Sequence, residues 1–445
     1  MLFNDIGLLA PEILLPREGT DLTRWAVVAC DQYTSQPEYW ERVRDFVGRS
    51  PSTFHIILPE AYLEECDSEE AARKINRTMT EYLDKDVLVP CSPGFILVDR
   101  ATAHKSSRKG LVVALDLEHY DFHEGSTSLI RATEGTVIDR LPPRIKIRQE
   151  APIESPHIMV LIDDPGRTVI EPLFKKDLRK VYDFDLMEGS GHIRGYLVSG
   201  EQTLAEVAEA LSKLADPDAF QEKYGVKDRN VLLYAMGDGN HSLATAKEIW
   251  EKLKKDAPDP AGVMGHPARF ALVELVNLHN EALTFEPIDR VVFNCPVNDM
   301  LKRMESYYTA QGSSFSVDMC DTRDAFRTIP PRLPDTHRVS FVTSGSCGMI
   351  SIRNPRLTLE VGTLQSFLDE YIKDTGIKID YIHGEKIVNE LASRPDTVGF
   401  FLPAISKFDF FRTIVKDGVL PRKTFSMGHA DEKRFYLECR KILPG

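Results

Sequence analysis

Hydrophobic and polar residues follow two patterns along the chain, and together these patterns predict strands interspersed with helices. Short, continuous apolar runs rich in β-branched residues are typical of buried strands. Such runs occupy residues 25–30, 95–98, 111–115, 157–162, 231–236, 271–278 and 339–342. Apolar residues at helical spacing, with charged residues between them, predict amphipathic helices. These helices are expected at residues 37–47, 68–83, 203–214, 243–253 and 432–442.

The order of these segments predicts an α/β (α+β) fold, in which a mixed sheet is flanked by helices. Polar stretches near residues 215–217 and 299–313 indicate boundaries within one packed body. We therefore expect an N-terminal α/β lobe over residues 1–215, a core over residues 216–300 and a C-terminal lobe over residues 301–445 that packs on the core. The N-terminal lobe carries Asp31 and the arginine-rich segment 131–148.

Composition narrows the class of protein. With 42% hydrophobic and 28% charged residues, the 445-residue chain has a globular composition, and its net charge of −13 disfavours nucleic acid and anionic membranes as partners. Its apolar runs are too short to span a bilayer, and its start lacks the basic region of a signal peptide. Seven scattered cysteines without a Cys-x-x-Cys pair argue against a zinc ribbon or a disulfide framework. We expect a cytoplasmic protein with a small-molecule substrate and no membrane or nucleic-acid partner; a homodimer stays open.

The segment 237–242, Gly-Asp-Gly-Asn-His-Ser, lies between the strand at 231–236 and an amphipathic helix. Gly237 and Gly239 let the backbone turn sharply and approach a ligand closely. The first N–H groups of the following helix have no internal partners and carry the positive end of the helix dipole. Asn240 and Ser242 add short polar side chains, and His241 adds a group that titrates near neutral pH. The sequence therefore predicts a phosphate-binding loop.

Asp238 is the unusual member of this loop, because a carboxylate repels a phosphate. It fits if Asp238 binds Mg²⁺ or takes a proton from a hydroxyl nucleophile. The alternative is a capping loop without a ligand, in which Asn240 or Asp238 is the N-cap. The loop has neither the Gly-x-x-x-x-Gly-Lys-Ser/Thr pattern nor the Gly-x-Gly-x-x-Gly fingerprint.

The strand–loop–helix unit resembles the Asp-Gly-His-His-Arg motif of the superfamily that contains sulfiredoxin, the ParB-type nucleotide-binding domains and the archaeal free-serine kinase. The resemblance implies a ParB/sulfiredoxin-like phosphate-binding core, elaborated here by additional lobes. Asn240 stands where His is usual, and Ser242 where Arg is usual. A phosphate site without that arginine needs a cation from elsewhere in the chain.

Nearly the whole chain also resembles the bacterial family known as domain of unknown function 1015. The segments that carry this resemblance are residues 29–40, 142–144, 237–247 and 424–429. Genes of that family often lie beside serine-biosynthesis genes. Together with the loop motif, this resemblance implies a serine kinase-like role.

Several residues outside the loop are candidates for the missing cation and for the catalytic base. Arg131 and Arg144 carry the planar fork that grips phosphate oxygens, and we expect them to replace the missing arginine. Asp31, at the end of a predicted strand, is a second acid/base or metal carboxylate, or else an Asx turn before Pro37. Glu134 is the other candidate base. Residues 145–148 also fit an exposed basic strand.

Two glycine-containing polar segments, 383–385 and 423–429, are candidates for loops that close over a substrate. His383 and His429 fit equally well as ordinary turn residues.

These features predict phosphoryl transfer to the hydroxyl of free serine or a similar metabolite. The loop would cradle the phosphate, and Arg131 and Arg144 would neutralise its charge. Asp238 would hold Mg²⁺, either alone or with Asp31 as a second protein ligand. Glu134 or Asp31 would take the hydroxyl proton, and His241 completes the set of catalytic candidates. ATP, ADP and pyrophosphate remain open as donors. Two alternatives use the same loop: a ParB-like nucleotide-sensing module, and a phosphatase with water as the acceptor.

Overall fold

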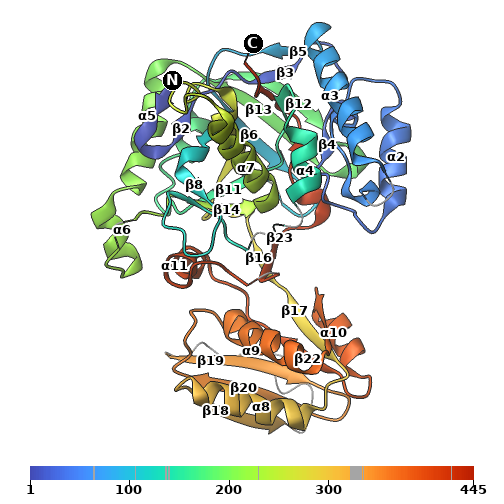
Figure 1. Cartoon of the computed structure of the whole chain (residues 1–445), viewed down its shortest axis with the longest axis vertical. Helices are drawn as coiled ribbons and strands as arrows, with labels where there is room; N and C mark the ends of the chain where they lie inside the picture. The colour runs from blue at the N-terminus through green and yellow to red at the C-terminus, as the bar shows by residue number, and fades with distance from the viewer. Residues whose placement is uncertain are drawn as a thin grey trace. The chain divides into compact units, whose positions relative to one another are not determined.

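The computed structural model describes residues 1–63, 66–105, 107–135, 138, 141–228, 230–320, 333, 335–421 and 423–444. The chain forms two compact units, with Met1–Thr284 and Gly428–Gly445 in unit 1 and Phe285–Met427 in unit 2. In Figure 1 the red C-terminal residues accordingly return to the unit that holds the blue N-terminus. These boundaries differ from those indicated near residues 215 and 300, because one sheet of unit 1 continues through the first of them.

Unit 1 is built around a large mixed sheet, in the order β12-β13-β6-β7-β15-β11-β14-β9-β8, with β2 also paired to β7 and β1 to β2. Neighbours from β12 to β15 are antiparallel, β15 and β11 are parallel, β11 and β14 are antiparallel, and β14, β9 and β8 are parallel. The bounds of the sheet strands are β1 Leu2–Phe3, β2 Leu8–Leu9, β6 Phe95–Ala101, β7 Arg108–Asp116, β8 Tyr120–Asp121, β9 Ile130–Arg131, β11 Met159–Ile162, β12 Arg179–Asp185, β13 His192–Val198, β14 Tyr234–Asp238 and β15 Phe270–Asn277.

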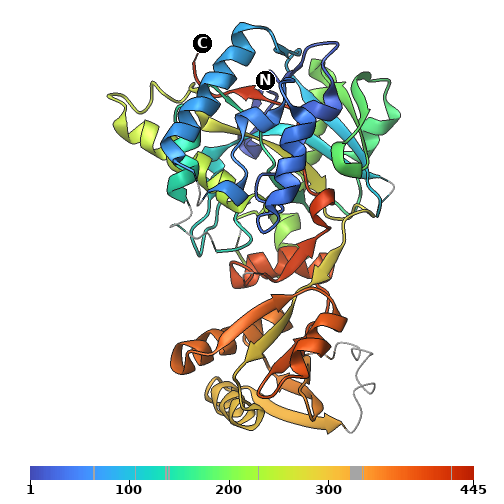
Figure 2. The same cartoon turned by 90° about the vertical axis from the view of Figure 1, so that its right-hand side faces the viewer.

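Shorter strand pairs and the helices complete unit 1. The pairs are β3 with β5, β4 with β24, and β10 with β25. Figure 2 looks onto α2 and α3, which cover one side of the unit. The bounds of these strands are β3 Leu14–Pro16, β4 Val27–Val28, β5 Leu88–Pro90, β10 Ile153–Glu154, β24 Phe435–Tyr436 and β25 Arg440–Lys441. Those of the helices are α1 Leu22–Trp25, α2 Pro37–Val47, α3 Ser68–Asp84, α4 Leu141–Arg148, α5 Glu201–Leu214, α6 Pro217–Tyr224 and α7 Asn240–Asp256.

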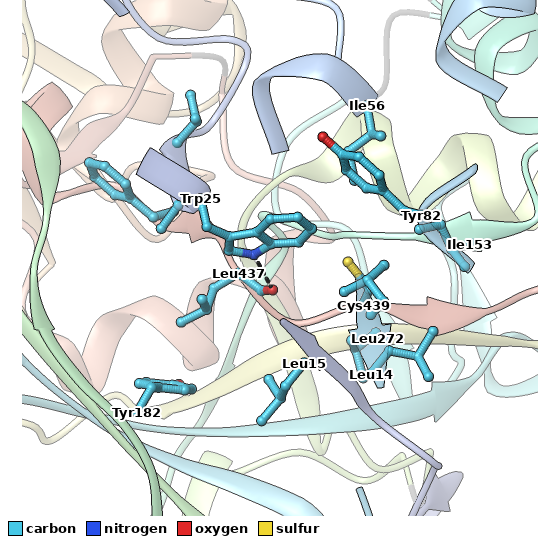
Figure 3. Packing of buried hydrophobic residues seen from close by; sticks show 14 of the residues in the cluster. Leu14, Leu15, Trp25, Ile56, Tyr82, Ile153, Tyr182, Leu272, Leu437 and Cys439 are labelled. Atoms are coloured by element: carbon cyan, nitrogen blue, oxygen red, sulfur yellow. Dashed lines mark hydrogen bonds between the residues drawn. The ribbon is translucent and has the colours of Figure 1, made fainter. Parts of the chain in front are cut away.

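The core of unit 1 joins the two ends of the chain. Trp25 is fully buried, and its indole Nε1–H donates to the carbonyl oxygen of Leu437 at 3.0 Å. Figure 3 shows residues from distant parts of the sequence packed around this ring, among them Leu14, Tyr82 and Cys439. The C-terminal segment is therefore part of the hydrophobic core of unit 1.

Three segments in or beside this core differ from what the sequence pattern indicated. Residues 432–442, expected as a helix, run mostly extended through β24 and β25, because alternate side chains face a buried polar network and the apolar core. Residues 145–148, which fit an exposed strand, belong to helix α4, which packs between α3 and α7. Residues 25–30 contain the end of α1 and the short strand β4 in place of one continuous strand.

Unit 2 contains a second, antiparallel sheet with the strand order β18-β20-β19-β22-β17-β21. Arg290 of β17 bonds Gln365 of α9, whereas the next residue, Val291, packs with Val388 of α10. Since successive strand residues face opposite sides, α9 and α10 cover opposite faces. The bounds are β16 Phe285–Pro287, β17 Asp289–Phe293, α8 Val297–Ala310, β18 Ser314–Cys320, β19 Thr336–Val342, β20 Cys347–Arg353, α9 Glu360–Thr375, β21 Lys378–Ile382, α10 Glu385–Ala392, β22 Val398–Phe401, α11 Lys407–Asp417 and β23 Phe425–Met427.

The predicted α/β class, a mixed sheet with flanking helices, is confirmed. In the described part of the chain no helix is both long and apolar enough to cross a membrane. Five cysteines of the described residues are free thiols, and Cys347 is disulfide-bonded.

Candidate functional site

The predicted loop forms the connection between β14 and α7 in unit 1. Asp238 ends β14, where it pairs with Met159 of β11, and Asn240 begins α7. Gly239 between them has φ +81°, the left-handed conformation that favours glycine. A Cβ atom at Gly239 would lie 3.1 Å from the Cα of Ile158, so the backbones also approach closely there. Both constraints explain why glycine occupies this position.

The N-cap residue of α7 provides no side-chain cap. Gly239 is the N-cap residue, and no side chain bonds the first-turn N–H groups from that position. The Asn240 carboxamide points elsewhere and accepts a hydrogen bond from the Thr133 N–H at 3.3 Å. The alternative in which Asp238 or Asn240 caps the helix is therefore not what the structure contains. The positive end of the α7 dipole lies at Gly239, which provides no side-chain cap, and the Ser242 N–H donates to the Gly239 carbonyl at 3.0 Å.

The Asp238 carboxylate forms an ion pair with Lys433 from the C-terminal segment. Lys433 Nζ lies 3.1 Å from Asp238 Oδ2, and the Gly239 N–H donates to Asp238 Oδ1 at 2.9 Å. Burial opposes ionisation of this group, but the Lys433 ammonium and the nearby His157 outweigh it and lower the pKa of Asp238. Asp238 is thus a carboxylate at neutral pH, with a cation beside the start of α7.

Buried arginines hold the backbone that carries Lys433. The Arg100 guanidinium donates to the carbonyl oxygens of Asp431 and Lys433, and Arg108 donates to that of Glu432 at 2.7 Å. The next residue, Arg434, donates to the Pro156 carbonyl at 3.1 Å. Lys433 therefore reaches Asp238 from a rigid, multiply bonded segment.

His157 connects the loop to Asp31. Its side chain is buried, with 6% of the residue exposed, and its Nε2 lies 3.4 Å from Ser242 Oγ and 3.9 Å from Asp31 Oδ2. On the other side of the ring, Nδ1 lies 2.6 Å from the Tyr436 hydroxyl. The Tyr436 contact fixes the orientation of the imidazole. Asp31 and Ser242, predicted from distant segments, are thereby brought together.

Cys30 shares the Tyr436 hydroxyl but is not a nucleophile. The Tyr436 O–H donates to Cys30 Sγ at 3.0 Å, and the Cys30 N–H donates to the same hydroxyl at 3.3 Å. Burial and the neighbouring Asp31 raise the pKa of the Cys30 thiol to about 12. The thiol therefore stays protonated and serves to position Tyr436.

A cavity of about 150 Å³ opens beside Ser242 and His157. Apolar side chains of α3 and α4 form part of its wall, and the ion pair between Arg144 and Glu60 lies at its rim. The cavity is small, and its polar lining combines groups near the loop, such as His157 and Ser242, with the Arg148–Glu154 ion pair. It suits a small metabolite held next to the start of α7.

The structure brings together some of the predicted site residues and separates others. Asp31, Asp238, Asn240 and Ser242 lie in one region, with Gly237 and Gly239 in the turn and His241 half-buried in the first turn of α7. Arg144 lines the neighbouring cavity. Glu134 follows Thr133, the residue that bonds Asn240.

Arg131 does not face the loop as expected. Only 6% of it is exposed, and its guanidinium donates to the carbonyl oxygens of Ser128 and Asn230 at 2.8 and 2.7 Å. Asn230 precedes β14, whereas the loop follows it. The cation at the loop is Lys433 in place of Arg131, whose bonds hold the start of β14 against β9.

The carboxylates near the loop do not form a ready-made metal site within the described residues. Across the residues that the structure describes, no group of three His, Cys, Asp or Glu side chains could hold a metal ion. Asp238 faces the Lys433 ammonium, and Asp31 faces His157. One carboxylate together with substrate phosphates is a usual way to bind Mg²⁺, so Asp238 fits only such a shared site.

Sequence reasoning missed Lys433, His157 and Tyr436. Lys433 and Tyr436 lie in the C-terminal segment that was expected as a helix, and their contacts with the loop depend on tertiary packing. The signal that could have found Tyr436 is alternation: Arg434, Tyr436, Glu438 and Arg440 are buried residues with polar groups at every second position.

Comparisons with known proteins give the following similarities. The family described as "Protein of unknown function (DUF1015)" matches residues 14–371. No curated protein matches the chain.

A conserved hypothetical protein from Pyrococcus furiosus has 12% sequence identity and a TM-score of 0.35, over 73% of this chain and 93% of its own. A free serine kinase in complex with AMP has 11% identity and a TM-score of 0.38, over 74% and 92%. SbnI with a C-terminal truncation, from Staphylococcus aureus, has 8% identity and a TM-score of 0.33, over 75% and 83%. Since these identities and TM-scores are low, the function has to be inferred from the residues of the site.

Proposed function

The chain belongs to the DUF1015 family of proteins of unknown function, and we propose that it is a phosphotransferase that moves a phosphoryl group to the hydroxyl of free serine or a similar small metabolite. The observation that carries this proposal is the Lys433–Asp238 pair beside the uncapped start of α7. An uncapped helix start and an ammonium group both attract phosphate oxygens. A carboxylate kept ionised next to them is what a phosphoryl-transfer site needs for a metal-bound donor or for the acceptor proton.

Each group has a distinct role in this proposal. The first-turn N–H groups of α7 and the Lys433 ammonium bind the phosphate oxygens and stabilise the charge on them in the transition state. His157, oriented by Tyr436, adds a third contact beside Ser242. Asp31 is the base that accepts the proton of the acceptor hydroxyl, with Glu134 as the other candidate.

The cavity beside Ser242 would hold the acceptor. Its volume of about 150 Å³ suits a metabolite the size of an amino acid, and it adjoins the proposed phosphate site. Serine as the acceptor is supported by the resemblance of the loop to the motif of the free-serine kinases. Mg²⁺ would arrive with the donor phosphates and supply charge neutralisation there, with Asp238 as its protein ligand.

The test is phosphorus NMR of the purified full-length protein with Mg²⁺ and L-serine, with ATP, ADP and pyrophosphate offered in parallel samples. We expect a new phosphomonoester signal that requires serine and appears with at least one donor. The donor that gives the signal is thereby identified.

Samples without serine provide the control. Inorganic phosphate released equally fast with and without serine would contradict transfer and indicate a phosphatase. Tight nucleotide binding without turnover of any donor would contradict the enzyme and indicate a nucleotide-sensing module.

A further inference from the structure

Unit 2 contains a cavity of its own, of about 360 Å³, on the face of the sheet that α10 covers. Its floor comes from alternate residues of three adjacent strands: Asp289 of β17, Ser340 and Val342 of β19, and Phe401 of β22. Its wall is the segment His383–Glu385 that leads into α10. All of these residues belong to unit 2, so the cavity does not involve the site at α7.

Packing of α10 explains why the cavity lies where it does. Val388 and Ala392 of α10 pack closely against the sheet at Gly399, where a Cβ atom would lie 2.6 Å from Val388 Cγ1. The helix begins only at Glu385, after Gly384, whose φ is +93°. The part of the face beyond the start of the helix, around Asp289 and Ser340, is therefore left uncovered.

Asp289 is a buried carboxylate that is only half satisfied. The residue is 6% exposed and lines the cavity, and its Oδ1 accepts a hydrogen bond from the Leu402 N–H at 3.0 Å. Its second oxygen makes no hydrogen bond to the described residues. Burial raises the pKa of this carboxyl to about 6, although the Leu402 N–H and the Arg290 charge act in the opposite direction. This second oxygen is not among the solvent-inaccessible unpaired atoms, so it is open to the cavity and can accept a hydrogen bond from a ligand.

The charges around Asp289 select a cationic ligand. Glu286 of β16 and Glu385 of α10 also line the cavity, together with His383. The Arg290 side chain turns to the opposite face of the sheet, where it bonds Gln365. Among the described residues no set of His, Cys, Asp and Glu side chains has the geometry to hold a metal ion. An organic cation remains as the class of ligand that these groups favour.

We propose that this cavity binds a small aliphatic amine, whose ammonium group bonds Asp289 and whose methylene groups contact Val342, Phe401 and Leu402. Glu286 and Glu385 supply further negative charge for a second amino group, so a diamine matches the cavity better than a monoamine. This site is independent of the function proposed for unit 1.

The test is isothermal titration calorimetry of the full chain with 1,4-diaminobutane at pH 7 and pH 5. We expect binding at pH 7 and about tenfold weaker binding at pH 5, because Asp289 is then mostly protonated. Protonation of His383 weakens binding in the same direction. The variant Asp289→Asn therefore separates the effect of Asp289 from that of His383. It should bind the diamine at least about tenfold more weakly at pH 7 and lose most of the pH dependence.

Two controls accompany this experiment. Asp289→Asn keeps an oxygen that can accept the Leu402 N–H, and an unchanged thermal unfolding midpoint verifies its fold. Asp380→Asn changes an exposed carboxylate on the neighbouring strand β21 and should bind the diamine like the unaltered protein. The proposal is overturned if 1,4-diaminobutane does not bind, if Asp289→Asn binds it equally well, or if uncharged 1,4-butanediol binds with the same affinity.

Discussion

At the Asp238 carboxylate, burial and an incoming phosphate would both oppose the ionised form. The Lys433 ammonium, 3.1 Å away, offsets both, and it can bridge the carboxylate and a phosphate oxygen. In the Asp-Gly-His-His-Arg motif that the loop resembles, an arginine stands at the position that Ser242 occupies here. One residue from the end of the chain thus supplies the positive charge that the loop lacks.

Lys433→Met should therefore remove most of the phosphoryl transfer while the protein stays folded. We expect turnover to fall by about 100-fold or more, since the lost ammonium stabilises developing charge in the transition state. The rate of phosphomonoester formation measures this effect.

Lys180→Met is the matched control. Lys180 pairs with Asp183 at 2.6 Å on the partly exposed strand β12, in the same kind of Lys–Asp pair but outside the site. Its turnover should equal that of the unaltered protein. A similar fall in both variants would contradict a specific role for Lys433.

The sequence predicted those site residues whose evidence is local. Asp238, Asn240 and Ser242 follow a strand and begin a helix, which a short segment reveals by itself. Asp31 was found because it ends an apolar run. Lys433, His157 and Tyr436 meet the loop only through tertiary packing, which no local pattern encodes, and Arg131 looked free because its two carbonyl acceptors are backbone groups.

At the scale of elements, the turn between β14 and α7 determines where the helix start points. Gly239 combines a left-handed backbone with close contact to Ile158, so a side chain there meets both a conformational and a steric penalty. The turn directly follows the pairing of β14 with β11, so the register of that pair determines where the turn lies. Any shift of the turn would move the start of α7 away from Lys433.

Gly239→Ala should destabilise the protein by about 1–3 kcal/mol and also reduce turnover. Gly225→Ala is the control, because Gly225 has a similar φ of +64° but nothing within 4 Å of its added Cβ atom. It should cost about 1 kcal/mol and leave turnover unchanged. Denaturant titration and the phosphorus assay measure the two effects, and equal turnover in both variants would argue against the close approach at Ile158.

Elements with regular amphipathic patterns were predicted well. The helices at α2, α3, α5 and α7 and the central strands β6, β7, β11 and β15 appear where the pattern indicated them. The C-terminal segment was misread because Arg434, Glu438 and Arg440 are charged yet buried in ion pairs, so hydrophobicity no longer marks the inward face. Strand order could not be read from the sequence, since it depends on contacts between distant segments.

At the scale of the whole molecule, the C-terminal residues complete unit 1 after unit 2 has interrupted it. Trp25 bonds Leu437, Arg434 bonds Glu274 of β15, and Arg440 bonds Glu154 of β10. Removing one partner of a buried ion pair leaves an uncompensated charge in the core, which costs about 3–5 kcal/mol. The insertion of unit 2 into unit 1 does not change the amino-acid composition at the boundaries. For this reason the sequence indicated three consecutive lobes.

A chain that ends at Met427 should therefore fail to fold in unit 1, because several such penalties together exceed the stability of a typical domain, about 5–15 kcal/mol. Circular dichroism and limited proteolysis would report this loss. A chain that ends at Ile442 keeps all of these bonds and should unfold at the same temperature as the 445-residue chain. A folded, protease-resistant unit 1 in the shorter chain would refute the structural role of the segment.

The central claim is that phosphoryl transfer takes place at the Asp238–Lys433 pair beside the start of α7. Its most direct test is the rate of phosphomonoester formation from L-serine by Asp238→Asn, measured beside Asp183→Asn, whose carboxylate lies in the exposed Lys180 pair. The account predicts a fall of about 100-fold or more for Asp238→Asn and an unchanged rate for Asp183→Asn. An Asp238→Asn protein that transfers phosphate as fast as the unaltered chain would contradict it.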